Sequence, residues 1–376
     1  MRHSRFERAR RDLLRMAHTG YDLSRVFDET ARLVRQAVPF DAACLHTLDP
    51  ASLLETSQTV LDLPLPQPRA TEIEYLEQDV NKFSDLARTS QVGILHEATH
   101  HQPERSPRYR ELLEPHGLEG ELRVVFSSGA NAWGAAGLLR SRGSTPFTEE
   151  EAAFLRGVSE IVARAIRATL VRASVHQEQD LPDAPGVILL GGDNRVTTVS
   201  PVARRWLAML PDAFNSDPPY VVYAVATQTR LALRGIHDRT AHARVRTRAG
   251  DWVVLHGTLL SEDPAGGLAV IVERAAPPTL APLIAHAYGL SEREREVLQL
   301  LLQGEGTREV AEQLVISPYT VQEHLKSVFD KVGVRSRREL IGRIFYGQYH
   351  PRMMQRDDLG RDGFFAQRGA AGLGRS

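Results

Sequence analysis

Cysteine, lysine and long apolar runs are the scarce features of this 376-residue chain. The single cysteine, Cys44, excludes an intramolecular disulfide and fits a reducing compartment. Lysine occurs three times, so arginine supplies nearly all of the positive charge. Because the formal net charge is −1, no overall field attracts nucleic acid. Any affinity for nucleic acid must come from a local surface.

No apolar run approaches the roughly 18 residues that a membrane helix requires. The opening stretch, "MRHSRFERARRDLLRM", is charged throughout and lacks the apolar centre of a signal peptide. We therefore expect a cytoplasmic protein with no membrane partner. The length allows two or three domains.

Residues 287–346 carry the start and stop signals of short helices. Ser291 and Glu294 form an S-x-x-E capping box that opens the first helix. Ser317 is placed to cap the third helix, with Pro318 at its first position, where a missing N–H costs nothing. A glycine, Gly333, closes that helix.

The third helix has two chemically different sides at about 100° per residue. The apolar side contains Val321, Leu325, Val328, Phe329 and Val332. The polar side contains Tyr319, Gln322, Glu323, Lys326 and Asp330. In a major groove, glutamine pairs with adenine, lysine donates to guanine and glutamate accepts from cytosine. The polar side therefore suits DNA bases, although a solvated face of a packing helix has the same pattern.

The stretches "LSEREREVL" and "EVAEQLVISPYTVQEHLKSVFDKVGV" resemble the LuxR-type helix-turn-helix family. The resemblance covers nearly all of residues 287–346 and implies an all-α DNA-binding module. The family often has lysine after the Thr-Val pair, whereas this chain has Gln322 followed by Glu323. The departure makes the target sequence hard to deduce but leaves the fold prediction intact.

The LuxR-type resemblance and the helix geometry together predict roles for individual residues. We expect Gln322, Glu323 and Lys326 to face base edges. The DNA backbone would be contacted by Ser317, Tyr319, Thr320, Lys331 and Arg335. By resemblance, a last short helix, capped by Ser336 and Glu339, would expose Leu340, Ile341 and Ile344 for pairing two modules. The alternative for these three side chains is packing within the module.

The N-terminal half reads as helices around a strand-rich centre. Residues 1–19 are an N-terminal helical segment in which residues 4–18 predict an exposed helix, and Asp22 caps a second helix that Pro39 ends. "FDAACLHTLD" and "VGIL" predict strands, residues 50–90 are mixed, and "ELRVVFSSGANAWGAAGLLRSR" predicts a hairpin. A long helix capped by Thr148 follows. Through "GANAWGAAGLLR" and "PFTEEEAAFL", residues 20–172 resemble a GAF domain, which implies a small-molecule sensor or a dimerisation module.

A second strand-rich block occupies residues 183–274. Its order of strand, turn, strand and helix, followed by three strands, resembles a PAS domain. Residues 275–286 are a proline-rich linker, and residues 347–376 predict a disordered tail. The expected fold class is multidomain α+β: GAF-like and PAS-like antiparallel sheets followed by an all-α helix-turn-helix.

The sequence gives only weak indications of a catalytic or cofactor-binding site. "HEATH" at residues 96–100 matches the H-E-x-x-H pattern of zinc proteases, but that site needs both histidines on one long helix. His101 and Pro103 cut such a helix short, so a metal-dependent hydrolase is a remote alternative. His237, His242 and His256 are candidate haem ligands that read better as ordinary polar residues. Cys44 reads as a small core residue. We expect no cofactor, no metal and no enzymatic activity.

The resulting hypothesis is a sequence-specific transcriptional regulator that binds double-stranded DNA as a homodimer. Its effector is unknown, and RNA polymerase is a candidate partner. The alternative is an interaction protein in which Gln322 and Glu323 have weakened or abolished DNA binding.

Overall fold

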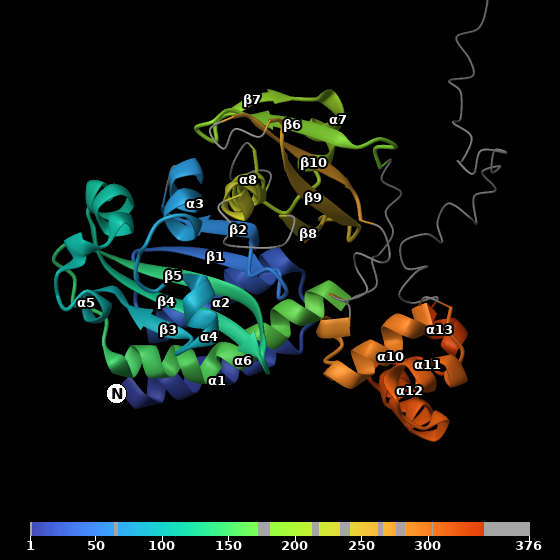
Figure 1. The fold of residues 1–376 in the computed structure, drawn as a ribbon. Helices are drawn as coiled ribbons and strands as arrows, with labels where there is room; N and C mark the ends of the chain where they lie inside the picture. Colours follow the sequence, from blue (N-terminus) through green and yellow to red (C-terminus); the bar gives the residue numbers. More distant parts are fainter. Residues whose placement is uncertain are drawn as a thin grey trace, which may run out of the picture. The chain divides into compact units, whose positions relative to one another are not determined.

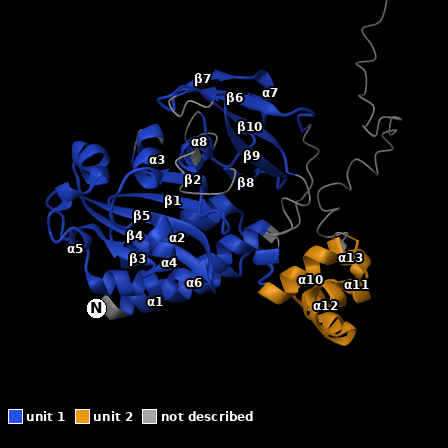
Figure 2. Ribbon diagram, viewed as in Figure 1, with its two compact units in different colours: residues 1–289 blue, residues 290–376 orange. Residues whose placement is uncertain are grey.

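A computed structural model describes residues 2–63, 67–171, 181–212, 218–233, 241–261, 266–275, 283, 285–302 and 304–341. The chain divides into two compact units, residues 1–289 and 290–376 (Figure 2). Most of the expected linker and all of the expected tail at 347–376 lie outside the described residues. The expected α+β class is confirmed: the first unit contains two antiparallel sheets with helices, and the described residues of the second unit form helices without strands (Figure 1).

The first sheet has five antiparallel strands in the order β2-β1-β5-β4-β3. The strands are β1 (Ala42–Leu48), β2 (Glu55–Leu61), β3 (Val92–Ile94), β4 (Leu118–Ser128) and β5 (Asn131–Ser141). The predicted hairpin is β4–β5, and the alternating stretch before it is β1. The edge strand β2 was not predicted, because "ETSQTVL" has few apolar residues and its polar side chains are nevertheless buried at Glu55, Thr56 and Ser57.

Three helices cover one face of this sheet: α1 (Arg2–Ala17), α2 (Leu23–Ala37) and α6 (Glu149–Val171). The predicted caps of α2 and α6 are present, since Asp22 accepts from the Arg25 N–H at 2.8 Å and Thr148 accepts from the Glu151 N–H at 3.3 Å. The prediction that α1 is an exposed helix was wrong. Its Ala9, Leu13 and Met16 lie at helical spacing and are buried against α2 and α6. The arginines between them form the solvent-exposed face of the helix.

The opposite face is covered by short elements and carries buried charge. These elements are α3 (Gln67–Tyr75), α4 (Phe83–Arg88), α5 (Leu95–Ala98), two 3₁₀ turns (Pro103–Arg105 and Glu114–His116) and a π-helical turn (Tyr109–Leu113). Arg108 donates to both oxygens of Glu121 at 3.0 Å and to Asp79 at 2.8 Å. This side of the sheet therefore combines buried ion pairs with two small apolar clusters, whereas the larger apolar core lies on the other side.

The second sheet has the order β7-β6-β10-β9-β8. The strands are β6 (Gly186–Leu190), β7 (Val196–Val199), β8 (His242–Arg246), β9 (Trp252–Leu259) and β10 (Leu268–Arg274), with α7 (Pro201–Leu207) after β7. These elements follow the predicted order, while the PAS-like assignment of the region stays a prediction. Helix α8 (Tyr220–Leu233) was not predicted, because "YVVYAVATQTRLAL" is rich in β-branched residues and apolar on all sides.

Helix α8 lies between the two sheets of the first unit (Figure 1). It packs on β9 and β10 of its own sheet and on β2 and α3 of the other. The Thr227 hydroxyl donates to Thr71 on α3 at 3.3 Å. Close by, Arg244 of β8 forms a two-bond ion pair with Asp49, both contacts 2.7 Å, and both side chains are buried. Polar contacts buried at this junction hold the two sheets in one unit.

Candidate nucleic-acid interface

The described residues of the second unit form four helices: α10 (Glu292–Leu302), α11 (Thr307–Leu314), α12 (Pro318–Val332) and α13 (Arg337–Ile341). The capping box predicted for the first is present, with the Ser291 N–H donating to Glu294 at 2.6 Å and the Glu294 N–H to Ser291 at 3.3 Å. Ser317 accepts from the Thr320 N–H at 3.0 Å. Gly333 closes α12 at φ 72°, in the left-handed region that glycine adopts without strain. Local sequence signals thus fix the start of α10 and both ends of α12.

Helix α12 divides into the two sides that its sequence predicts. Val321, Leu325, Val328 and Val332 are buried against the other helices of the module. The exposed residues on the helix are Pro318, Tyr319, Gln322, Glu323, Lys326, Asp330 and Lys331. Among them, Tyr319 is 73% exposed, which is unusual for an aromatic ring and leaves its hydroxyl accessible. The exposed side offers amide, carboxylate and ammonium groups along one continuous helical face.

One buried carboxylate anchors α12 to α10. Glu294, 5% exposed, accepts from the Ser327 hydroxyl at 2.6 Å and from Lys331 Nζ at 2.6 and 2.9 Å. Burial alone raises the pKa of Glu294, but the hydrogen bonds from Lys331, Ser327 and the Ser291 N–H outweigh burial and lower this pKa to about 2. Glu294 is therefore ionised at neutral pH and holds the orientation of the helix that carries the exposed face.

Lys331, which we expected to contact the DNA backbone, has an ion-pair partner within the module. Its ammonium is engaged by Glu294 within the module, 37 residues away in sequence. Arg337 is likewise used internally, since it donates to the Glu305 carbonyl at 2.7 Å. Arg335 remains exposed, and its side chain forms no ion pair within the described part of the chain. The basic end of the module is thus divided between structural and accessible charges.

The last helix also differs from its expected role. Leu340 is fully buried, so the prediction that it is exposed for pairing two modules was wrong. Its backbone N–H binds the Ser336 carbonyl, and the short helix turns Leu340 inward. The side chain of Ile341 and all of Ile344 lie outside the described residues.

A second concentration of functional groups was not found from the sequence. On the charged face of the first sheet, His46 and Glu55 are buried with Nδ1 and Oε2 3.6 Å apart, and neither atom has a hydrogen-bond partner. Burial, then the Glu74 carboxylate, raises the pKa of Glu55 to about 8. Burial, then Arg123, lowers the pKa of His46 to about 3. The signal available was the pair Glu121 and Arg123 in the stretch "ELRVVF" of β4, whose other residues are apolar.

The H-E-x-x-H segment lacks the geometry of a zinc protease. Helix α5 has four residues and ends at Ala98. His100 follows in the left-handed region at φ 54° and His101 at 60°. His96 and His100 therefore do not lie on successive turns of one helix, which the zinc-binding pattern requires.

The other candidate ligands do not converge either. His242 and His256 are cross-strand neighbours with ring centroids 6.5 Å apart, and His237 lies outside the described residues. Burial of the Cys44 thiol raises its pKa to about 12, which makes it a poor nucleophile. In the described ranges, no group of three or more His, Cys, Asp or Glu side chains is arranged to hold a metal ion.

Comparisons with known families match the two ends of the chain. Residues 289–343 match the family described as "Bacterial regulatory proteins, luxR family". Residues 22–166 match the GAF domain family. Across the residues that the structure describes, no helix combines the length and the apolar character needed to cross a membrane.

Curated relatives include a protein named as a transcriptional regulator. A putative HTH-type transcriptional regulator of Mycobacterium bovis is 30% identical over 200 residues, which is 49% of this chain and 22% of that protein. The spore germination protein GerE of Bacillus subtilis is 42% identical over 52 residues, which is 14% of this chain and 70% of GerE. The chain thus spans about a fifth of the mycobacterial relative.

Solved structures give only distant similarity. A GAF domain/HD domain protein from Geobacter sulfurreducens is 20% identical, with a TM-score of 0.29 over 39% of this chain and 93% of that chain. A TM-score this low supports no argument about function.

Proposed function

Because the chain belongs to the LuxR family of bacterial regulatory proteins and carries a GAF domain, we propose that it is a sequence-specific DNA-binding transcriptional regulator. The observation that carries the proposal is the exposed face of α12, built from Gln322, Glu323 and Lys326. These three residues read bases, because their side chains match the donors and acceptors of the major groove.

Contacts to the DNA backbone come from residues around the start and end of α12. Ser317, Tyr319, Thr320 and Arg335 supply them. The hydroxyl of Thr320 is 2.8 Å from that of Ser317, so one of the two donates to the other and the remaining O–H can donate to a phosphate. Lys331 acts through Glu294 instead, by fixing how α12 stands on α10.

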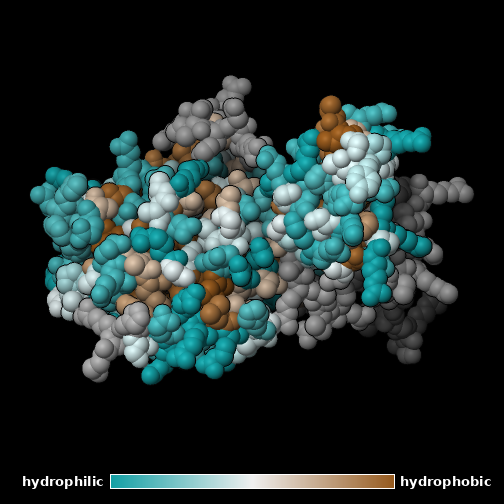
Figure 3. All heavy atoms as spheres, turned by 90° about the horizontal axis from the view of Figure 1, so that it is seen from below, coloured by the Kyte–Doolittle hydropathy of each residue, from teal (hydrophilic) through white to brown (hydrophobic). Residues whose placement is uncertain are grey.

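The regulator acts as a homodimer, since a palindromic site read by two modules doubles the contacts that one short helix offers. Because Leu340 is buried, other surfaces of the chain form the dimer contact. The face seen from below is mainly hydrophilic with scattered apolar patches, so no single large apolar patch marks the contact on that face (Figure 3). The GAF and second-sheet region responds to an effector and changes how the two modules are presented, inside the cytoplasm and within reach of RNA polymerase. The protein has no catalytic role.

Selection of random duplex DNA by the full-length protein tests this function. We expect a twofold-symmetric motif that Lys326→Ala loses or relaxes, because Lys326 donates to base edges. Glu312→Gln, an exposed change on α11, is the matched control and should leave the motif intact.

Failure of the full-length protein to enrich any motif, under low-salt conditions and across candidate effectors, would contradict the proposal. It would favour a regulator that works through protein contacts. The carboxylate of Glu323 on the exposed face is the feature that such an outcome would implicate, because it repels phosphate.

A further inference from the structure

A hollow of about 400 Å³ opens on the helix-covered side of the GAF domain, between α2 and the edge strand β2. Its lining residues are Asp28, Ala31, Arg32, Arg35, Gln36 and Leu61. A volume of this size is in the range of small-molecule sites. The hollow lies on the opposite face of the sheet from the buried charges around Arg123 and Glu55.

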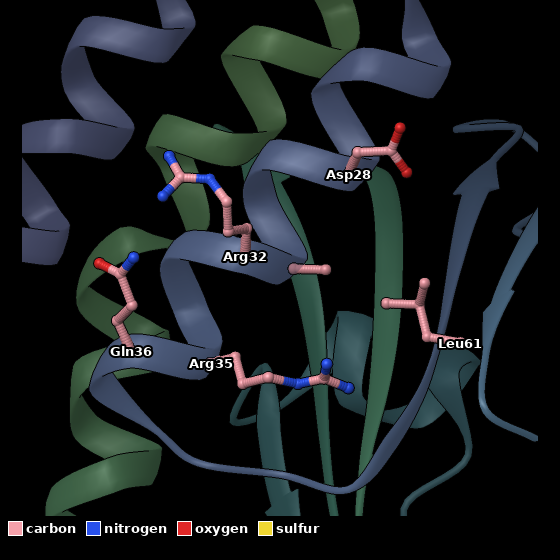
Figure 4. Close-up of a pocket in the computed structure, with 6 residues that line it drawn as sticks. Asp28, Arg32, Arg35, Gln36 and Leu61 are labelled. Carbon is pink, nitrogen blue, oxygen red and sulfur yellow. The ribbon is translucent and has the colours of Figure 1, made fainter.

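The charges around the hollow are arranged by helical spacing. Asp28, Ala31 and Arg35 follow one another at i, i+3 and i+7, which places them on one face of α2. Asp28 and Arg35 extend toward the side where Leu61 of β2 lies, whereas Arg32 and Gln36 leave the helix on its other side (Figure 4). The hollow therefore has a carboxylate at one end, a guanidinium at the other, and an apolar floor of Ala31 and Leu61 between them.

Both charged ends are available to a ligand. No hydrogen bond or ion pair engages the Asp28 carboxylate within the described ranges. Arg35 is held in place by stacking on Phe40, with 4.4 Å from its guanidinium carbon to the ring centroid, and by a 3.2 Å hydrogen bond to the Asp41 carbonyl. Its only ion pair there is a 3.6 Å contact with Asp62, whose side chain is 74% exposed. Exposed pairs of this kind are weak and exchangeable.

From this arrangement we infer that the hollow binds a small zwitterion with an apolar middle, about the size of an unmodified tripeptide. Seven residues of helix separate Asp28 from Arg35, which is about 10 Å at the helical rise. An extended tripeptide spans roughly the same distance between its ammonium and carboxylate. Its ammonium pairs with Asp28, its carboxylate with Arg35, and its central side chain covers Ala31 and Leu61.

Packing contacts connect the hollow to the rest of the first unit. Leu61 ends β2, the strand on which α8 packs, and α8 carries the second sheet. A ligand that ties α2 to β2 changes the support on which α8 rests. This last step rests on the proposed function, whereas the binding step stands by itself.

The probe is Gly-Leu-Gly, observed by saturation-transfer NMR of its leucine methyl groups with the full-length protein. We expect saturable binding, with N-acetylated and C-amidated forms of the peptide each weakened about two- to fivefold, the loss of one exposed ion pair. Asp28→Asn should weaken the free peptide and leave the acetylated peptide unchanged. Arg35→Gln should weaken the free peptide and leave the amidated peptide unchanged.

Two further variants act as controls, one expected to strengthen binding and one expected to leave it unchanged. Asp62→Asn removes the carboxylate that competes for Arg35 and should tighten binding. Arg25→Gln, on the same helix but outside the hollow and paired with Glu29 at 3.3 Å, should not change it. All four positions have exposed side chains, so unchanged tryptophan emission will show that the variants fold.

Absence of saturable binding up to roughly 10 mM would overturn the inference. Equal binding of the free and capped peptides would overturn it too, because neither charged end would then be recognised. Binding without any effect on DNA affinity would keep the site and remove its link to regulation. Failure of DNA binding in every condition would count against the proposed function and leave the peptide measurements valid.

Discussion

Replacing Glu55 by glutamine should make the first unit more stable at neutral and alkaline pH. Glu55 is 2% exposed, and its Oε2 has no hydrogen-bond partner. Its backbone N–H donates to the Tyr75 hydroxyl at 3.0 Å, and its carboxyl group hydrogen-bonds with Tyr220 of α8. A glutamine keeps these contacts and the volume. It also removes a carboxyl group that is costly to ionise in this position.

The magnitude follows from the raised pKa. In the unfolded chain Glu55 ionises near 4.5, and in the folded chain near 8. A raised acid pKa means that the folded state binds the proton more tightly, so this contribution is full below pH 4.5 and is lost as the pH rises toward 8. Each pKa unit is about 1.36 kcal/mol. At pH 7 the wild type should therefore lose about 3 kcal/mol of its free energy of unfolding, a loss that Glu55→Gln does not have.

The lowered pKa of His46 acts in the opposite direction, since folding then becomes more favourable as the pH rises from about 3 to 6.5. That contribution is common to both proteins. The difference between Glu55→Gln and wild type therefore isolates the carboxyl group.

Urea unfolding from pH 5 to 8, followed by tryptophan emission, measures this difference. Trp133, Trp206 and Trp252 are the three tryptophans of the chain, and all are buried in the first unit, so the signal reports on that unit. Glu7→Gln, an exposed change on α1, is the control and should show no pH-dependent difference. If the stabilities of Glu55→Gln and wild type differ by a constant amount from pH 5 to 8, the buried, protonated state of Glu55 is refuted.

Four further predictions concern the second unit and the lone thiol. Lys331→Met removes the cation that pairs with the ionised Glu294. The free energy that protects the α12 amides from hydrogen exchange should therefore fall by about 1.5–3 kcal/mol. The slope of the dependence of DNA affinity on salt concentration should stay unchanged. Arg335→Gln should instead reduce that slope by about 0.9, and equal slopes for the two variants would contradict the assigned roles. Leu340→Ala should destabilise the second unit by about 2–5 kcal/mol in hydrogen exchange, and an undiminished protection would place Leu340 outside the core. Cys44 should resist Ellman's reagent at pH 8 until urea unfolds the first unit, because its pKa is raised to about 12; rapid reaction of the folded protein would contradict the raised pKa.

The sequence by itself determined the features that depend on neighbours three or four residues apart. The capping boxes at Ser291 and Thr148, the closing Gly333 and the two sides of α12 all follow from hydrogen bonds or periodicity within one or two helical turns. Alternation did the same for β1 and the β4–β5 hairpin. Those local patterns also carry both family resemblances, to GAF domains and to LuxR-type regulators.

Only the tertiary structure decided the features that depend on residues far apart in the chain. Lys331 and Glu294 are both charged groups of helical segments, and nothing in either segment shows that one neutralises the other. Helix α8 has no polar side to reveal its period, because it is buried between two sheets. Glu55 sits in a polar stretch, yet the packing of Tyr220 and His46 around it withdraws it from water. Burial is set by what covers a residue, and the covering elements are brought together by chain folding, which local patterns do not encode.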